Sequence, residues 1–171
     1  SNIVQKNDPI TGTSFNLDVD GNENVSALGD GLMIIRKLFG SAFAGDALTN
    51  KAISDNATRT TDEIHEYIQS GIDSLALDVD KNGKVTALGD GLMVIRKLFG
   101  SAFDGAKLTD KAISNDATRD SQAIHEYIEA AIDHNILDID GNGKVTALGD
   151  GLMVIRKLFG SAFDGAKLTD K

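Results

Sequence analysis

A repeat of sixty residues constrains this chain more than any other feature of its sequence. The segments 78–111 and 138–171 differ at two positions, and residues 18–51 form a more divergent copy of the same pattern. Such near-identity is typical of recent duplication within a longer array of small units. We divide the chain into an irregular N-terminal segment, two full repeats and a shortened third repeat, with the boundaries 1–16, 17–76, 77–136 and 137–171.

Each repeat contains an apolar segment that predicts a buried helix. In the second repeat this segment covers residues 87–99, and apolar side chains occupy most of the helical circumference. We therefore expect other elements to cover the helix on more than one side. Arg96 and Lys97 suit the negative end of the helix dipole, and Gly100 is placed to end the helix.

A second, amphipathic helix is predicted to lead into the second and third loops. Thr60 and Glu63 have the spacing of a capping box at its start. Isoleucines recur every four residues along one face, with a tyrosine beside them. The residues of this face are Ile64, Tyr67, Ile68 and Ile72 in one copy, and Ile124, Tyr127, Ile128 and Ile132 in the next. The predicted order is helix, acidic loop, helix around both Asp78 and Asp138.

The connector between the two helices, for example residues 104–116, contains acids whose spacing matches no ligand template. We interpret it as a loop. Leu108 and Ile113 are expected to pack into the core.

The acidic loop itself has the spacing of a calcium site. Polar residues occupy positions one, three, five and nine of the loop that begins at Asp138. Calcium takes six to eight oxygen ligands, and alternate residues of a tight loop turn their oxygens toward one centre. Gly143 stands at position six, where the chain turns sharply, and Lys144 at position seven offers its backbone carbonyl. Val145 at position eight lets paired loops form a small strand contact.

The acid that closes each loop comes one residue later than in the EF-hand pattern. An EF-hand has a glutamate at position twelve, where this loop has Gly149, and Asp150 follows at position thirteen. Asp30 and Asp90 repeat the shift. We infer that an extra residue, made tolerable by glycine, brings a shorter carboxylate into the place of the usual glutamate. The alternative is that these acids only stabilise the start of a helix.

Three sets of candidate calcium ligands follow, with a capacity of up to three Ca²⁺ ions. Turns rich in Asp and Asn also occur without a metal, but three loops with one ligand pattern favour the metal. We expect the first site to be the weakest, because Glu23 replaces the glycine at position six and no helix precedes that loop. The candidates are Asp18, Asp20, Asn22, Asn24, Ser26 and Asp30; Asp78, Asp80, Asn82, Lys84, Thr86 and Asp90; and Asp138, Asp140, Asn142, Lys144, Thr146 and Asp150.

The loop sequence DIDGNGKVTAL, residues 138–148, resembles the calcium-binding repeat of dockerins. A dockerin loop also closes with an aspartate, at position twelve, and an apolar helix with a basic pair follows it, similar to Arg156 and Lys157. The resemblance implies a mainly α fold of tandem EF-hand-like, dockerin-like helix-loop-helix repeats. It also implies that loop positions ten and eleven help to recognise a cohesin. Those positions are Ala27 and Leu28, Ala87 and Leu88, and Ala147 and Leu148.

The composition favours a cation as the partner of these small units. There is no cysteine, so disulfides and thiolate metal sites are excluded, and a metal is the remaining way to stabilise a small core. With 26 acidic and 17 basic residues the formal charge is −9, the wrong sign for binding nucleic acid or an anionic membrane. No run reaches the roughly 18 apolar residues of a transmembrane helix, so no membrane insertion is expected.

Three functions remain open, all within a larger secreted or cell-surface protein. The first is a structural module that calcium folds and makes rigid, in contact with neighbouring repeats. The second is an adaptor that binds a cohesin-like domain in a polysaccharide-degrading or surface assembly. The third is a calcium sensor that exposes an apolar groove, for which Met33, Met93 and Met153 are the candidate lining.

We do not expect an enzyme. His65 and Glu66 resemble the start of a zinc-protease motif, but Gln69 stands where that motif has its second histidine. Nothing in the sequence places a nucleophile beside a base with an orienting acid.

Overall fold

The computed structural model describes residues 15–132, and these fold into helices and loops. The mainly helical class predicted from the sequence is confirmed for this part of the chain. Its α-helices are α2 (Leu32–Leu38), α3 (Thr61–Asp73), α4 (Leu92–Leu98) and α5 (Ser121–Ile132). Short turns accompany them, of π type at η2 (Ala27–Gly31) and η5 (Ala87–Gly91), and of 3-10 type at η3 (Gly40–Phe43), η4 (Gly45–Ala47), η6 (Gly100–Phe103) and η7 (Gly105–Lys107).

The amphipathic helix α3 begins at the predicted capping box. The Thr60 hydroxyl accepts a hydrogen bond from the backbone N–H of Glu63 at 3.2 Å, and the Thr60 N–H donates to Glu63 Oε1 at 2.9 Å. These two bonds pair N–H groups that a helix start otherwise leaves free. Ile64 and Ile68 are fully buried, so the isoleucine face lies in the core as expected.

The apolar segment after each of the first two loops is divided into two parts, where the sequence predicted one helix over 87–99 in the second repeat. Its first turn is the π turn η5, and only Leu92–Leu98 are α-helical. Gly100 has φ +87°, which ends the helix as predicted. The division lengthens the start of the helix by one residue, and this extra residue is part of the loop geometry described below.

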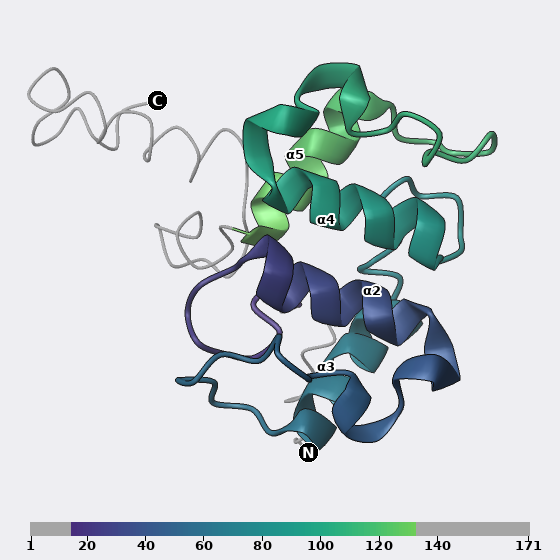
Figure 1. Cartoon of the computed structure of the whole chain (residues 1–171). Helices are drawn as coiled ribbons and strands as arrows, with labels where there is room; N and C mark the ends of the chain where they lie inside the picture. Colours follow the sequence, from purple (N-terminus) through teal and green to yellow (C-terminus); the bar gives the residue numbers. More distant parts are fainter. Residues whose placement is uncertain (1–14, 133–171) are drawn as a thin grey trace, which may run out of the picture. The chain divides into compact units, whose positions relative to one another are not determined.

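The two repeats pack against each other through α2 and α4, which lie side by side in Figure 1. A Cβ added at Gly31 would lie 3.1 Å from Ile95 Cγ1, and one at Gly91 would lie 3.2 Å from Ile35 Cγ1. The same glycine of each repeat therefore lets the helix of the other approach closely. Each central helix also packs on the second helix of its own repeat, α2 on α3 and α4 on α5.

The last described helix takes the place of the helix that the first loop lacks in sequence. The Leu77 N–H donates to the carbonyl of Gly71, near the end of α3, at 3.0 Å. The Leu17 N–H donates at 3.1 Å to the carbonyl of Ala131, sixty residues after Gly71, near the end of α5. Thus α5 contacts the start of the first loop in the same way as α3 contacts the start of the second loop. This contact connects the end of the second repeat to the start of the first.

One hydrophobic core runs through both repeats. Leu108 is fully buried and Ile113 packs against the cluster, as expected for the connector. Val25 and Val85, at loop position eight, are partly buried against this core. No strand forms within residues 15–132, so the strand contact predicted for position eight does not occur between these two loops. Burial of each large aliphatic side chain contributes roughly 1.5–3 kcal/mol.

Candidate metal centre

Two acid triads lie at equivalent places in the two repeats. In each, one carboxylate oxygen from every member lies within 4.8 Å of the others. The members are the first, third and thirteenth residues of the first loop (18–30) and of the second loop (78–90). The triads are Asp18, Asp20 and Asp30, and Asp78, Asp80 and Asp90. All six were predicted as ligands from their spacing.

The first aspartate of each loop holds the turn that follows it. Asp78 accepts a hydrogen bond from the Asn82 N–H at 3.0 Å and another from the Gly83 N–H at 2.8 Å, through different oxygens. Asp18 does the same with Asn22 and Glu23, at 3.0 and 2.8 Å. The turn thus folds around the first carboxylate of the loop, and a carboxylate oxygen of the third residue lies within 4.8 Å of it.

The position-thirteen aspartate reaches the centre because of the π turn. The Gly91 N–H donates to the Thr86 carbonyl at 3.0 Å, a five-residue spacing that accommodates the extra residue. The two oxygens of Asp90 accept from the N–H groups of Val79, at 2.8 Å, and of Thr86, at 2.9 Å. The side chain of Asp90 thereby connects positions two and nine of the loop. The inference of an inserted residue agrees with this geometry.

Burial raises the pKa of Asp30 and of Asp90 to about 6 each. Both side chains are 2% exposed. The two backbone hydrogen bonds to each carboxylate act in the opposite direction, and the other two acids of the triad raise the pKa further. A cation between the three carboxylates would remove that repulsion.

One buried oxygen in the second triad has no partner. Asp80 is 2% exposed, and its Oδ1 has no hydrogen bond, whereas its Oδ2 accepts two from Ser114. A buried polar atom without a partner costs about 1–3 kcal/mol, and more when it is charged. This oxygen belongs to a group of three acids and is the kind of atom that binds a hard cation.

The remaining predicted ligands of the first two loops make hydrogen bonds within the loop. The hydroxyls of Ser26 and Thr86 each accept a backbone N–H bond, from Gly29 and Gly89, and so start the π turns. The position-seven residues Asn24 and Lys84 donate their N–H groups to the Oδ1 atoms of Asn22 and Asn82. The third set, Asp138, Asp140, Asn142, Lys144, Thr146 and Asp150, lies outside the described residues.

Sequence reasoning missed the contribution of the connectors, residues 44–60 and 104–120. The Thr58 and Arg59 N–H groups donate to the Asp20 carbonyl, and the Arg59 guanidinium donates to the carbonyls of Asp18 and Val19. The same guanidinium lies 3.8 Å from the ring centre of Tyr67. The motif SxxATR recurs sixty residues later, with the same bonds, and this recurrence was the available signal.

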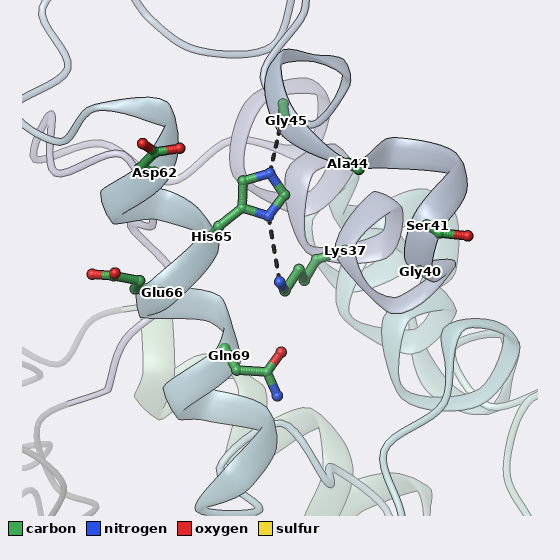
Figure 2. A pocket seen from close by; sticks show the side chains of 9 residues that line it. All are labelled: Lys37, Gly40, Ser41, Ala44, Gly45, Asp62, His65, Glu66 and Gln69. Carbon is green, nitrogen blue, oxygen red and sulfur yellow. Dashed lines mark hydrogen bonds between the residues drawn. The ribbon is translucent and has the colours of Figure 1, made fainter.

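A surface pocket beside α3 is lined by polar groups that contact one another. Figure 2 shows His65 between the Lys37 ammonium and the Gly45 carbonyl. Because an ammonium only donates, Nδ1 of His65 accepts at 3.3 Å, and Nε2 donates to Gly45 at 3.0 Å. Lys97, His125 and Gly105 repeat these contacts at 3.4 and 2.9 Å. We interpret them as fastening the connector to the second helix of each repeat.

Comparison of the chain with family models, with curated proteins and with solved structures gives no match. Within residues 15–132, none of the helices has the length and apolar character needed to cross a membrane. Interpretation of the site therefore depends on its own geometry.

Proposed function

We propose that this chain is a calcium-binding structural and interaction module, built of tandem EF-hand-like loops and belonging to a larger secreted or cell-surface protein. The observation that carries the proposal is the unpartnered Oδ1 of Asp80, which is buried among the carboxylates of Asp78 and Asp90. Fixed acids that repel one another are costly unless a cation joins them. The proposal assigns no catalytic residue.

Calcium is the cation that suits these loops best. Each triad offers oxygen ligands alone, and Oδ1 of Asn82 at position five of the second loop is a further amide oxygen. Calcium accepts irregular shells of six to eight oxygens, whereas magnesium requires a small octahedron and retains its water. Modules outside cells often bind calcium with dissociation constants of about 10⁻⁴ to 10⁻³ M, which the calcium of such surroundings saturates.

Calcium binding would act on the fold because both ends of the second loop lead directly to packed elements. Asp90 lies in η5, which packs on α2 of the other repeat, and Leu77 is hydrogen-bonded to the end of α3. Closing one loop therefore stabilises the contact between repeats. Three ions would also change the formal charge of −9 to about −3 and so reduce self-repulsion.

Titration of the full chain with calcium tests the proposal. Circular dichroism and small-angle scattering are expected to report more helix and a smaller radius as calcium is added, with reversal by a chelator. Magnesium at the same concentration serves as the control and is expected to give a much smaller change. A chain whose dichroism, scattering and heat of mixing are unaffected by millimolar calcium would contradict the proposal.

An adaptor function is the second candidate. Leu28 and Leu88 are 64% and 65% exposed, and they stand at the loop position that the dockerin resemblance connects with cohesin recognition. Binding to a panel of cohesin domains, with and without calcium, tests this candidate. Leu88→Asp is the variant that is expected to abolish such binding while leaving calcium uptake intact.

A further inference from the structure

In each of the first two loops, a serine of the connector donates two hydrogen bonds to the aspartate at position three. In the second repeat, the backbone N–H and the hydroxyl of Ser114 both donate to Oδ2 of Asp80, at 2.9 and 2.7 Å. In the first repeat, Ser54 makes the same two bonds to Oδ2 of Asp20, at 2.9 and 2.7 Å. The serine lies 34 residues after the aspartate in both cases.

These two bonds fix the direction of the carboxylate. Because both donors of Ser114 bind Oδ2, the plane of the Asp80 carboxylate cannot rotate freely, and Oδ1 is the oxygen left to face the other acids. That oxygen is buried and has no hydrogen-bond partner. The serine thus leaves one oxygen for a ligand and occupies the other.

The same hydroxyl joins two candidate ligands. Ser114 Oγ accepts a hydrogen bond from Nδ2 of Asn82 at 2.8 Å while it donates to Asp80. Ser54 connects Asn22 and Asp20 in the same way, at 2.8 and 2.7 Å. Chained hydrogen bonds of this kind strengthen one another and hold loop positions three and five in a fixed relation.

We propose that Ser54 and Ser114 are positioning residues that set the calcium affinity of the first and second loops from outside the loop sequence. The proposal rests on the calcium-binding function proposed above, and it adds that the connector is part of each site. A partner that orients a metal ligand typically changes metal affinity about 10- to 100-fold when it is removed.

The test compares Ser114→Ala with Thr118→Ala in the full chain. Thr118 belongs to the same connector, and its hydroxyl donates to the Lys81 carbonyl at 2.8 Å and not to a side chain of the acid triad. Ser114→Ala removes the hydroxyl's bonds to Asp80 and Asn82, and Thr118→Ala removes one bond to a backbone carbonyl, so only the Ser114 variant loses a side-chain contact with a carboxylate. Calcium affinity is measured by calorimetry, and the amide signal of Gly83 in NMR spectra identifies the second loop.

We expect Ser114→Ala to weaken the second site about 10- to 100-fold, with Ser114→Thr restoring most of the affinity because it retains the hydroxyl. Thr118→Ala is expected to change the affinity less than about threefold, and the first site, with Ser54 intact, is expected to bind as in the parent chain. Circular dichroism of each variant without metal verifies folding. If Ser114→Ala does not fold, Ser54→Ala replaces it, and the affinity is then measured at the first loop.

Two results would overturn the inference. One is unchanged affinity at the second loop in a folded Ser114→Ala chain. The other is an equal loss in Thr118→Ala, since that would show general loosening of the connector. If the parent chain binds no calcium, the proposed function itself fails, and this outcome is distinct from both.

Discussion

The first and second loops have positive φ angles at the same two positions but place their glycines differently. At position four the first loop has Gly21 with φ +73° and the second has Lys81 with φ +58°. At position six the order is reversed, with Glu23 at φ +68° and Gly83 at φ +89°. Each loop therefore has one non-glycine residue in the left-handed region, at a cost of roughly 1–2 kcal/mol.

Neither of the two features that predicted a weaker first site distinguishes the two loops. Glu23 alone does not rank the loops, because Lys81 imposes a similar cost on the second. The missing helix before the first loop does not rank them either, because α5 occupies that place. What does differ is Oδ1 of the third residue. In Asp20 it accepts the Asn22 N–H at 3.2 Å, whereas in Asp80 it has no partner. The lower affinity of the first site stays a prediction, now with this hydrogen bond as its basis.

Removal of the closing acid is the change with the largest expected effect. Asp90→Asn removes a negative charge from the second triad. It also places a side-chain NH₂ group beside a backbone N–H that donates a hydrogen bond to the carboxylate in the parent chain. We expect the calorimetric stoichiometry to fall by one calcium ion, a loss of more than about 100-fold at that loop. Asp30→Asn is the matched variant, with the same loss at the first loop. An unchanged stoichiometry in both would show that position thirteen supplies no ligand.

Acid is expected to weaken both sites to a similar degree, since Asp30 and Asp90 share a raised pKa of about 6. Calcium must displace their protons below that pH, so at pH 5 each site should bind roughly tenfold more weakly than at pH 7. Without metal, these two carboxyl groups should instead contribute more to the free energy of unfolding at low pH. A pKa raised above the unfolded value favours the folded state at low pH, and this contribution is lost as the pH rises through 6.

Calorimetry at pH 7 and pH 5 in constant ionic strength measures the first trend, and thermal unfolding with a chelator measures the second. A calcium affinity that does not change between these two pH values would contradict the burial of the two carboxylates.

Exchange of the strained residues for glycine has the smallest expected effect, and it measures the cost of the positive φ in each loop. Glu23→Gly and Lys81→Gly should each stabilise the metal-free chain by about 1 kcal/mol, because glycine adopts a positive φ without strain. The third repeat already has glycine at both positions, Gly141 and Gly143. Urea unfolding measures the change. Glu23→Ala is the control, since it removes the charge but retains the strain, and equal stabilisation by Ala and Gly would assign the effect to charge.

Much of the site was predictable because it is local in sequence. The acids of the first two loops each lie within thirteen residues of sequence, so their spacing alone identified them as candidate ligands, and the shifted Asp90 indicated an inserted residue. The capping box at Thr60 and the buried Ile64 and Ile68 also follow from short-range patterns, and the structure confirms them.

The parts that were not predictable depend on contacts between distant residues. The hydrogen bonds from Ser54 to Asp20 join residues that are 34 positions apart, and the bond from Leu17 to Ala131 joins residues more than a hundred positions apart. No periodicity of a single helix or loop carries such information. The division of 87–99 into a π turn and an α-helix was missed because the apolar pattern of the segment is compatible with either geometry.

A crystal structure of the full chain grown with calcium at saturating concentration would show whether the acid triads bind the ion. We predict an ion in the second loop, with Oδ1 of Asp80 about 2.3–2.6 Å from it and Oδ2 still bound to Ser114. The first loop should have an ion at the equivalent place. An empty second loop, or an ion that does not contact Oδ1 of Asp80, would contradict calcium binding by this acid triad.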